Sequence, residues 1–150
     1  MNQQHGLDPR GPRFTAAVTT VVLAAVLLLP TGAATALLAV QTVLFAWGAL
    51  RGVQHTPLAW VFRTVIRPRL AAPETLEDPR PPRFAQSVGL AFAVVGLIGH
   101  LGGVLLLGQV AVGLALVAAL LNAVTGFCLG CELYLIGKRL TARPRVAATN

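Results

Sequence analysis

The sequence predicts an all-α membrane protein with four transmembrane helices, arranged as two tandem hairpins that repeat in parallel orientation. Two stretches, Phe14 to Leu50 and Phe84 to Cys131, contain no Asp, Glu, Lys or Arg. Each stretch is long enough for two spans, because one spanning helix needs roughly 20 apolar residues. The whole chain is 55% hydrophobic and only 11% charged, whereas a soluble domain carries about 25% charged residues. This composition excludes a water-soluble fold.

Turn residues divide each stretch near its middle. Pro30-Thr31-Gly32 breaks the first stretch into spans 14–29 and 33–50, because Pro removes a helix donor and Gly tolerates turn geometry. Leu107-Gly108-Gln109 breaks the second into spans 84–107 and 110–127. The predicted segments are therefore an N-terminal tail (1–13), a first hairpin (14–51), a connection (52–83), a second hairpin (84–131) and a C-terminal tail (132–150).

The basic residues predict the orientation of these hairpins. The hairpin arrangement gathers all twelve Lys and Arg at one end: Arg10, Arg13, Arg51, Arg63, Arg67, Arg69, Arg80, Arg83, Lys138, Arg139, Arg143 and Arg145. Lys and Arg accumulate on the cytoplasmic side of membranes, so we expect a multi-pass plasma-membrane protein with both termini cytoplasmic. The net charge of +7 is then explained by attraction of the basic residues to anionic lipid headgroups, and nucleic acid is not expected as a partner.

An internal repeat supports two equivalent halves. The motif Asp8-Pro9-Arg10-Gly11-Pro12-Arg13-Phe14 returns with one difference as Asp78-Pro79-Arg80-Pro81-Pro82-Arg83-Phe84. Each half then closes with Arg-Pro-Arg, at Arg67 to Arg69 and at Arg143 to Arg145. Both halves start on the same side, so we expect parallel repeats related by an axis along the membrane normal.

The connection contains a predicted amphipathic helix, 57–67, at the cytoplasmic interface. Thr56 suits an N-cap and Pro57 a first helical position. The apolar residues that come next recur at helical spacing, which is typical of a helix that lies in the membrane interface. They are Leu58, Val61, Phe62, Val65 and Ile66.

The chain's only cysteines, Cys128 and Cys131, are the principal candidate site residues. Cytosolic thiols are normally kept reduced, so redox exchange, sulfur transfer, metal binding and inert packing all stay open. Two thiols alone do not make a zinc site. If the helix breaks at Gly130, Cys131 begins a new helix and becomes the better nucleophile, with Cys128 as the resolving thiol. If the helix is continuous, both cysteines lie at the negative C-terminal end of its dipole, which opposes a thiolate, as does the neighbouring Glu132.

Other polar residues are weaker candidates. Alignment of the two closing Arg-Pro-Arg triplets places Cys131 opposite His55, which suggests His55 as a third catalytic participant; the alternative is a polar interfacial residue before a helix cap. Intramembrane Gln41 and Asn122 are interpreted as interhelical hydrogen-bonding amides, and His100 is expected to bond a neighbouring backbone group. No cofactor-binding motif is found in the sequence, and no cofactor is expected.

The segment from Gly126 to Tyr134 (Gly-Phe-Cys-Leu-Gly-Cys-Glu-Leu-Tyr), with the upstream Pro-Arg-Phe and Pro-Arg-Leu elements, resembles a family of small membrane proteins. The family is mostly actinobacterial and is described as a domain of unknown function. The resemblance covers roughly Asp8 to Arg139 and implies a four-helix membrane protein without an established activity. It also implies a link to thiol or sulfur metabolism, through neighbouring genes for thioredoxin-like and rhodanese-like proteins.

The favoured hypothesis is thiol-redox or sulfur handling by Cys128 and Cys131, with a soluble thioredoxin-like or rhodanese-like partner. A structural or scaffolding membrane protein with inert cysteines is the first alternative. A small-molecule transporter that uses the repeat interface is the second. A metal site is the third, with its two further ligands supplied by His55 and Glu132 or by a second chain. The oligomeric state and the question of whether the protein is an enzyme stay open at this point.

Overall fold

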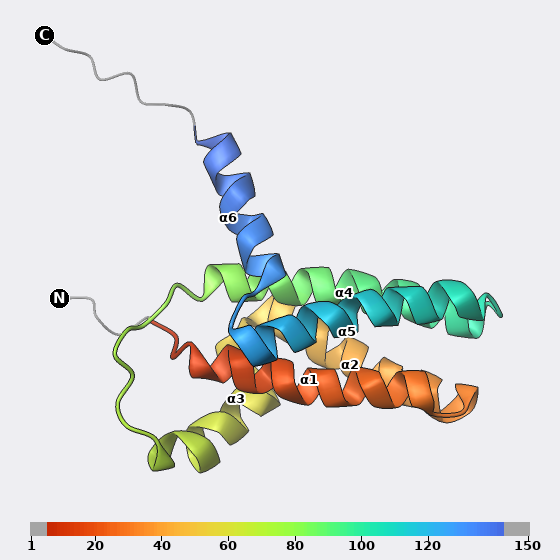
Figure 1. Cartoon of the computed structure of the whole chain (residues 1–150), viewed down its shortest axis with the longest axis horizontal. Coiled ribbons are helices and arrows are strands. Elements are labelled where there is room, and N and C mark those ends of the chain that lie inside the picture. The colour runs from red at the N-terminus through yellow and green to blue at the C-terminus, as the bar shows by residue number, and fades with distance from the viewer. Residues whose placement is uncertain (1–5, 143–150) are drawn as a thin grey trace, which may run out of the picture.

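Residues 6–142 are described by the computed structural model, and their regular structure is helical apart from one isolated β-bridge. Four long helices lie side by side as a bundle, and the shorter α3 and α6 project from one end of it (Figure 1). Each long helix is long and apolar enough to cross a membrane, which confirms the predicted fold class. The long helices are α1 (Arg10–Leu28), α2 (Thr31–Arg51), α4 (Arg80–Leu101) and α5 (Leu105–Thr125).

The core of the bundle is small and apolar. It includes Leu23 of α1, Leu38 and Phe45 of α2, and Val112 of α5, all buried. Many large apolar side chains point outward instead, as expected where the surroundings are lipid rather than water. In α4, His100 is half-buried, and its Nδ1 lies 2.9 Å from the carbonyl oxygen of Gly96, which confirms its predicted backbone partner.

The predicted turn at Leu107-Gly108-Gln109 is wrong. The chain turns between Leu101 and Leu105, where Gly103 has a φ of +75° that favours glycine. Gly108 lies inside α5 and is buried; a Cβ on Gly99 of α4 would lie 2.5 Å from its backbone nitrogen. Gly108 therefore serves close helix packing, and composition alone does not distinguish that use from a turn.

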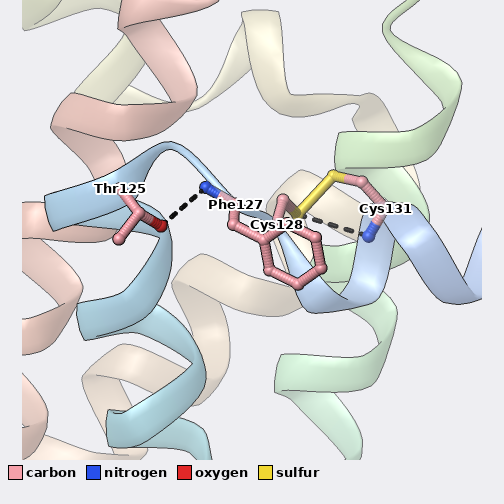
Figure 2. Close-up of a disulfide and its surroundings, with 4 residues drawn as sticks. All are labelled: Thr125, Phe127, Cys128 and Cys131. Carbon is pink, nitrogen blue, oxygen red and sulfur yellow. Dashed lines mark hydrogen bonds between the residues drawn. A yellow bond between two sulfur atoms is a disulfide. The ribbon is translucent and has the colours of Figure 1, made fainter.

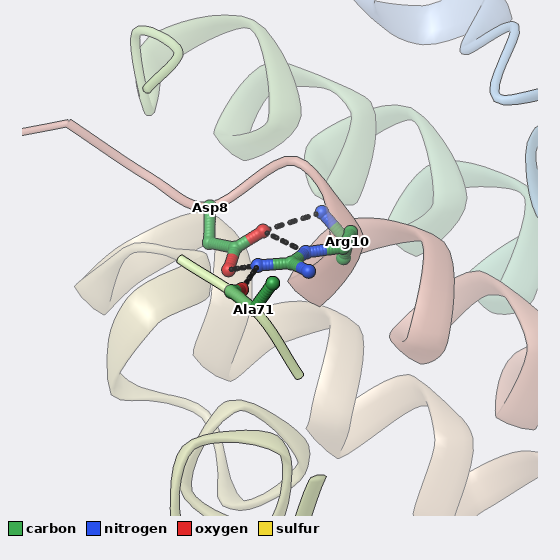
Figure 3. A network of polar contacts seen from close by, with 3 residues as sticks. All are labelled: Asp8, Arg10 and Ala71. Carbon is green, nitrogen blue, oxygen red and sulfur yellow. Dashed lines mark hydrogen bonds and ion pairs between the residues drawn. The ribbon is translucent and has the colours of Figure 1, made fainter. Parts of the chain in front are cut away.

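The duplicated motif makes equivalent contacts in both halves. Arg10 N and Arg80 N donate to the Asp8 and Asp78 carboxylates, at 3.0 and 2.9 Å. The Arg10 side chain also donates to Asp8 and to the carbonyl oxygen of Ala71 (Figure 3). These side-chain hydrogen bonds hold the pKa of the buried Asp8 below its ordinary value.

The second arginine of each motif reaches across to the other half. Arg83 of α4 donates to the carbonyl oxygens of Ala49 and Leu50, at 2.7 and 2.8 Å, at the end of α2. Arg13 of α1 donates to the corresponding carbonyls at the end of α5, those of Ala123 and Val124. Each arginine thus satisfies carbonyls that helix ends leave without intrahelical partners.

One pairing lies where a twofold axis would pass. The backbones of Leu7 and Glu77, which precede the two copies of the motif at equivalent positions, form an antiparallel bridge with hydrogen bonds of 2.8 and 2.9 Å. A residue pairs with its own equivalent in this way only on a twofold axis. The helix contacts agree, because α1 packs on α5 as α4 packs on α2. The second closing triplet, Arg143 to Arg145, lies outside the described residues.

The connection is helical from Pro57 to Arg69, which confirms the predicted helix with a change of winding. The Thr56 hydroxyl caps α3 (Pro57–Val61) by accepting from Ala59 N at 3.2 Å. Wider π-helical turns continue from Phe62 to Ile66, and a 3₁₀ turn, Arg67–Arg69, ends the run. The predicted apolar stripe is buried at Phe62, half-buried at Leu58, Val61 and Ile66, and exposed at Val65.

Candidate functional site

The cysteine pair lies at a helix start rather than at the end of the fourth span. α5 ends at Thr125, and Gly126 adopts a left-handed conformation with φ +77°. Phe127 N donates to the Thr125 hydroxyl at 3.1 Å, which tightens the turn (Figure 2). α6 (Leu129–Thr141) then begins with Cys128 as its N-cap. Of the two geometries that the sequence left open, a continuous helix and a break at Gly130, neither is found: the break lies between Thr125 and Leu129.

Cys128 and Cys131 are joined by a disulfide, with their Cα atoms 5.2 Å apart. Cys131 N also donates to Cys128 Sγ at 3.3 Å (Figure 2). Both residues are half-buried. The first turn of a helix has free N–H groups and a partial positive charge, so the N-cap position favours a thiolate on Cys128 when the pair is reduced. The argument from helix starts that favoured Cys131 thus favours Cys128.

α6 is fixed against α4 by two contacts. A Cβ on Gly130 would lie 2.7 Å from Ala85 Cα, so the two helices approach each other closely there. The second contact is between the rings of Tyr134 and Phe84, with centroids 5.7 Å apart. Leu129, Leu133, Ile136 and Leu140 remain exposed. Their spacing makes one apolar stripe along α6, as in helices that lie in a membrane interface.

Arg13 is a residue of the site that sequence reasoning missed. Its guanidinium donates to Ala123 and Val124 at 3.4 and 3.2 Å. A Cβ on Gly126 would lie 3.6 Å from Cδ and Nε of Arg13. A cation therefore lies against the turn that leads to Cys128. The duplicated motif was the available signal, since Arg13 is its second arginine.

His55, the third candidate site residue, makes its hydrogen bond to α2 and not to the cysteines. It is exposed, and its Nδ1 lies 2.8 Å from the carbonyl oxygen of Arg51. Superposing the two capped helix starts aligns Thr56 with Cys128 and Ala59 with Cys131. The alignment of the closing Arg-Pro-Arg triplets instead places His55 opposite Cys131. Within residues 6–142, no three His, Cys, Asp or Glu groups could hold a metal ion together. The structure therefore does not join His55 or Glu132 to the cysteines in a metal site.

Two features inside the described bundle bear on the transporter alternative. Gln41 is buried, and its Oε1 has no hydrogen-bond partner in the described part of the chain. A groove of about 260 Å³ between α4 and α5 has an apolar lining. It is lined by Ala91, Phe92, Val95, Leu107, Val110, Ala111 and Leu114. Such a groove suits a lipid chain better than a polar solute.

Comparison with known proteins gives a family but no activity. Residues 7–139 match the family model described as "Domain of unknown function (DUF4395)". This match confirms the expected resemblance to a family of unknown function, and it includes both copies of the motif and both cysteines. No curated protein and no solved structure matches the chain.

Proposed function

The chain belongs to the DUF4395 family, and from this membership and the geometry of its cysteine pair we propose that it is a membrane-anchored dithiol–disulfide protein. It exchanges electrons with a soluble thioredoxin-like protein. The observation that carries the proposal is the CxxC pair at the start of α6, with Cys128 as N-cap and within disulfide distance of Cys131. Helix starts of this kind are where reactive cysteines occur.

The reaction begins at Cys128. Its thiolate attacks one sulfur of the partner's disulfide, so a mixed disulfide forms and the partner's other sulfur leaves as a thiolate. Cys131 then loses its proton to water and attacks Cys128 Sγ. The intramolecular disulfide forms and the partner leaves as a dithiol, reduced by two electrons. A second soluble dithiol returns the pair to the reduced state by the reverse steps.

The position of the pair suits a partner from the cytoplasm. The ten cations among residues 6–142 belong to the helix ends, the connection and α6, all at the end of the bundle that holds both described chain ends (Figure 1). Lys and Arg collect on the cytoplasmic side, which supports a plasma-membrane protein with cytoplasmic termini. Cytosolic thiols are kept reduced, so the dithiol is the resting form and the disulfide is the oxidised form.

Trapping of the mixed disulfide tests this proposal. Full-length Cys131→Ser and Cys128→Ser variants in native membranes are mixed with a thioredoxin-like protein whose resolving cysteine has been removed. Its remaining cysteine is oxidised as a mixed disulfide with a good leaving group. The Cys131→Ser variant should form a covalent adduct through Cys128 that dithiothreitol releases. Adduct formation through Cys131 alone, or by neither variant, would contradict the proposal.

Sulfur transfer is the related alternative, and it is tested by incubating the same variants with a rhodanese-like protein that carries a sulfane sulfur. A rhodanese-like donor would pass its sulfane sulfur to the Cys128 thiolate, leave as a thiolate, and convert Cys128 into a persulfide. Mass spectrometry of the Cys131→Ser variant would then find one added sulfur atom at Cys128. If neither a protein adduct nor an added sulfur is found, the disulfide is a static clip on α6 and the scaffolding function replaces the proposed one.

A further inference from the structure

The two arginines that cap helix ends offer a comparison within one molecule. Arg13 and Arg83 hold equivalent positions in the duplicated motif, and each donates to two carbonyl oxygens at the end of a helix in the other half. Their structural duties are the same. The segments after the two capped helices differ, because α2 leads to Thr56 whereas α5 leads to Cys128.

Arg13 lies close in space to the turn that precedes the cysteine pair. A Cβ on Gly126, the left-handed residue that ends α5, would lie 3.6 Å from Cδ and Nε of Arg13. Cys128 is the second residue after Gly126, so their Cα atoms are at most about 7 Å apart. The turn against which Arg13 lies is therefore only two residues from the Cys128 thiol.

Other charged side chains near Cys128 also favour or oppose its thiolate. Glu132, in the first turn of α6, is the acidic group nearest along the chain and opposes a thiolate. α4, which packs on α6, contributes Arg80 and Arg83 in its first turn. Arg80 is paired with Asp78 at 3.8 Å, and Arg83 is bonded to the end of α2. Lys138 and Arg139 belong to the last turn of α6. Arg13 is the cation held against the turn itself.

We propose that Arg13 is a positioning residue for Cys128. By clamping the last carbonyls of α5 it fixes the Gly126 turn that makes Cys128 the N-cap of α6, and it holds a positive charge against that turn. This inference rests on the proposed exchange at Cys128. It assigns a redox duty to Arg13 and none to Arg83, although both arginines cap a helix.

The test measures the reactivity of Cys128 alone. Each variant is made in the full-length Cys131→Ser protein, and the rate of iodoacetamide alkylation of Cys128 is followed against pH by mass spectrometry. Arg13→Gln should slow alkylation at pH 7 by about three- to ten-fold and move its pH profile upward, as expected for loss of one nearby charge. Arg83→Gln, the matched control, should leave both unchanged. Arg13→Lys should restore at least half of the lost rate.

The outcomes separate the inference from the proposed function. Equal slowing by Arg13→Gln and Arg83→Gln, no slowing by Arg13→Gln, or no rescue by Arg13→Lys overturns the role of Arg13, while the exchange reaction stands. If the Cys131→Ser parent already reacts as an ordinary thiol and the wild type forms no disulfide under oxidant, the proposed function itself fails. Should Arg13→Gln not fold, the comparison of Arg13→Ala with Arg83→Ala decides, with slower alkylation expected only for Arg13→Ala.

Discussion

At the scale of residues, one short motif performs the same tasks twice. Its aspartate accepts from the backbone of its first arginine, at Asp8 and at Asp78. Its phenylalanine packs on an aromatic ring of the helix that comes after the hairpin: Phe14 on Phe62, and Phe84 on Tyr134, with centroids 6.0 and 5.7 Å apart. The Asp-Pro-Arg repeat is therefore a set of specific contacts, not merely a pair of basic clusters at the interface.

The two aspartates should differ in their contribution to stability. Asp8 is buried, and its carboxylate accepts hydrogen bonds from the Arg10 side chain at both oxygens. Its pKa is lowered, chiefly by this side-chain hydrogen bonding from Arg10. A lowered carboxyl pKa stabilises the fold at pH values above the ordinary value of about 3.9, and this stabilisation is lost as the pH falls through the lowered pKa. Asp8→Asn should therefore lower the Tm in detergent at pH 7 by a few degrees, and this deficit should shrink below pH 4.

Asp78→Asn is the matched control for this measurement. Its carboxylate is exposed and lies 3.8 Å from Arg80, and exposed pairs contribute about 0–1 kcal/mol. We expect a Tm close to that of the wild type at both pH values. A deficit for Asp8→Asn as small as that of Asp78→Asn would argue against a stabilising role for the buried pair.

Local chemistry is predictable at this scale and distant contacts are not. The cap at Thr56 can be predicted because its own hydroxyl and the next residue, Pro57, decide the matter. The role of Arg13 cannot, because its partners lie more than a hundred residues away. Gly126 and Gly130 look alike in sequence, yet Gly126 has the positive φ and Gly130 permits a close helix approach.

At the scale of elements, α6 depends on the absence of one side chain. A Cβ at Gly130 would stand 2.7 Å from both Ala85 Cα and Ala85 Cβ, which is closer than real atoms pack, so α6 or α4 would have to move. We expect Gly130→Ala to loosen α6 from α4, to increase cleavage within α6 by a soluble protease, and to slow formation of the disulfide under oxidant.

Gly137→Ala is the control for this substitution in the same helix. A Cβ there meets no atom within 4 Å, and alanine is favoured over glycine in a helix by roughly 0.5–1 kcal/mol. Cleavage should therefore stay at or below the wild-type level. Equal protease sensitivity of the two variants would show that the contact with Ala85 does not hold α6.

The spans themselves are predictable because their signal is a long property of the chain. Four spans follow from two charge-free stretches, each too long for one helix. The predicted turn between α4 and α5 is misplaced, because Gly102-Gly103 and Gly108 compete within a uniformly apolar stretch and the choice depends on packing against Gly99.

At the scale of the whole molecule, the two halves share one plan and differ at the site. One twofold axis relates the two halves. It passes between Leu7 and Glu77, and it relates the hydrogen bonds of Arg13 to those of Arg83 and the capped start of α3 to that of α6. Thr56 and Ala59 therefore occupy in the first half the places of Cys128 and Cys131. The first half provides the scaffold of the site without its thiols.

This equivalence predicts that the site can be rebuilt in the first half. In a Cys128→Ser/Cys131→Ser background, the pair Thr56→Cys with Ala59→Cys should form a disulfide under oxidant, because Thr56 Oγ1 already accepts from Ala59 N as Cys128 Sγ does from Cys131 N. The pair Thr56→Cys with Leu58→Cys should not, since residues two apart in a helix do not face each other. Comparable yields from the two pairs would refute the equivalence.

The central claim, a reversible dithiol at the start of α6, is tested most directly by differential alkylation in native membranes. Free thiols are blocked with one reagent, disulfides are reduced, and the released thiols are labelled with a second reagent before mass spectrometry. Untreated membranes should carry the first label on Cys128 and Cys131, membranes treated with oxidant the second label on both, and membranes reduced again the first label. Cysteines that keep one label through all three treatments would contradict the claim.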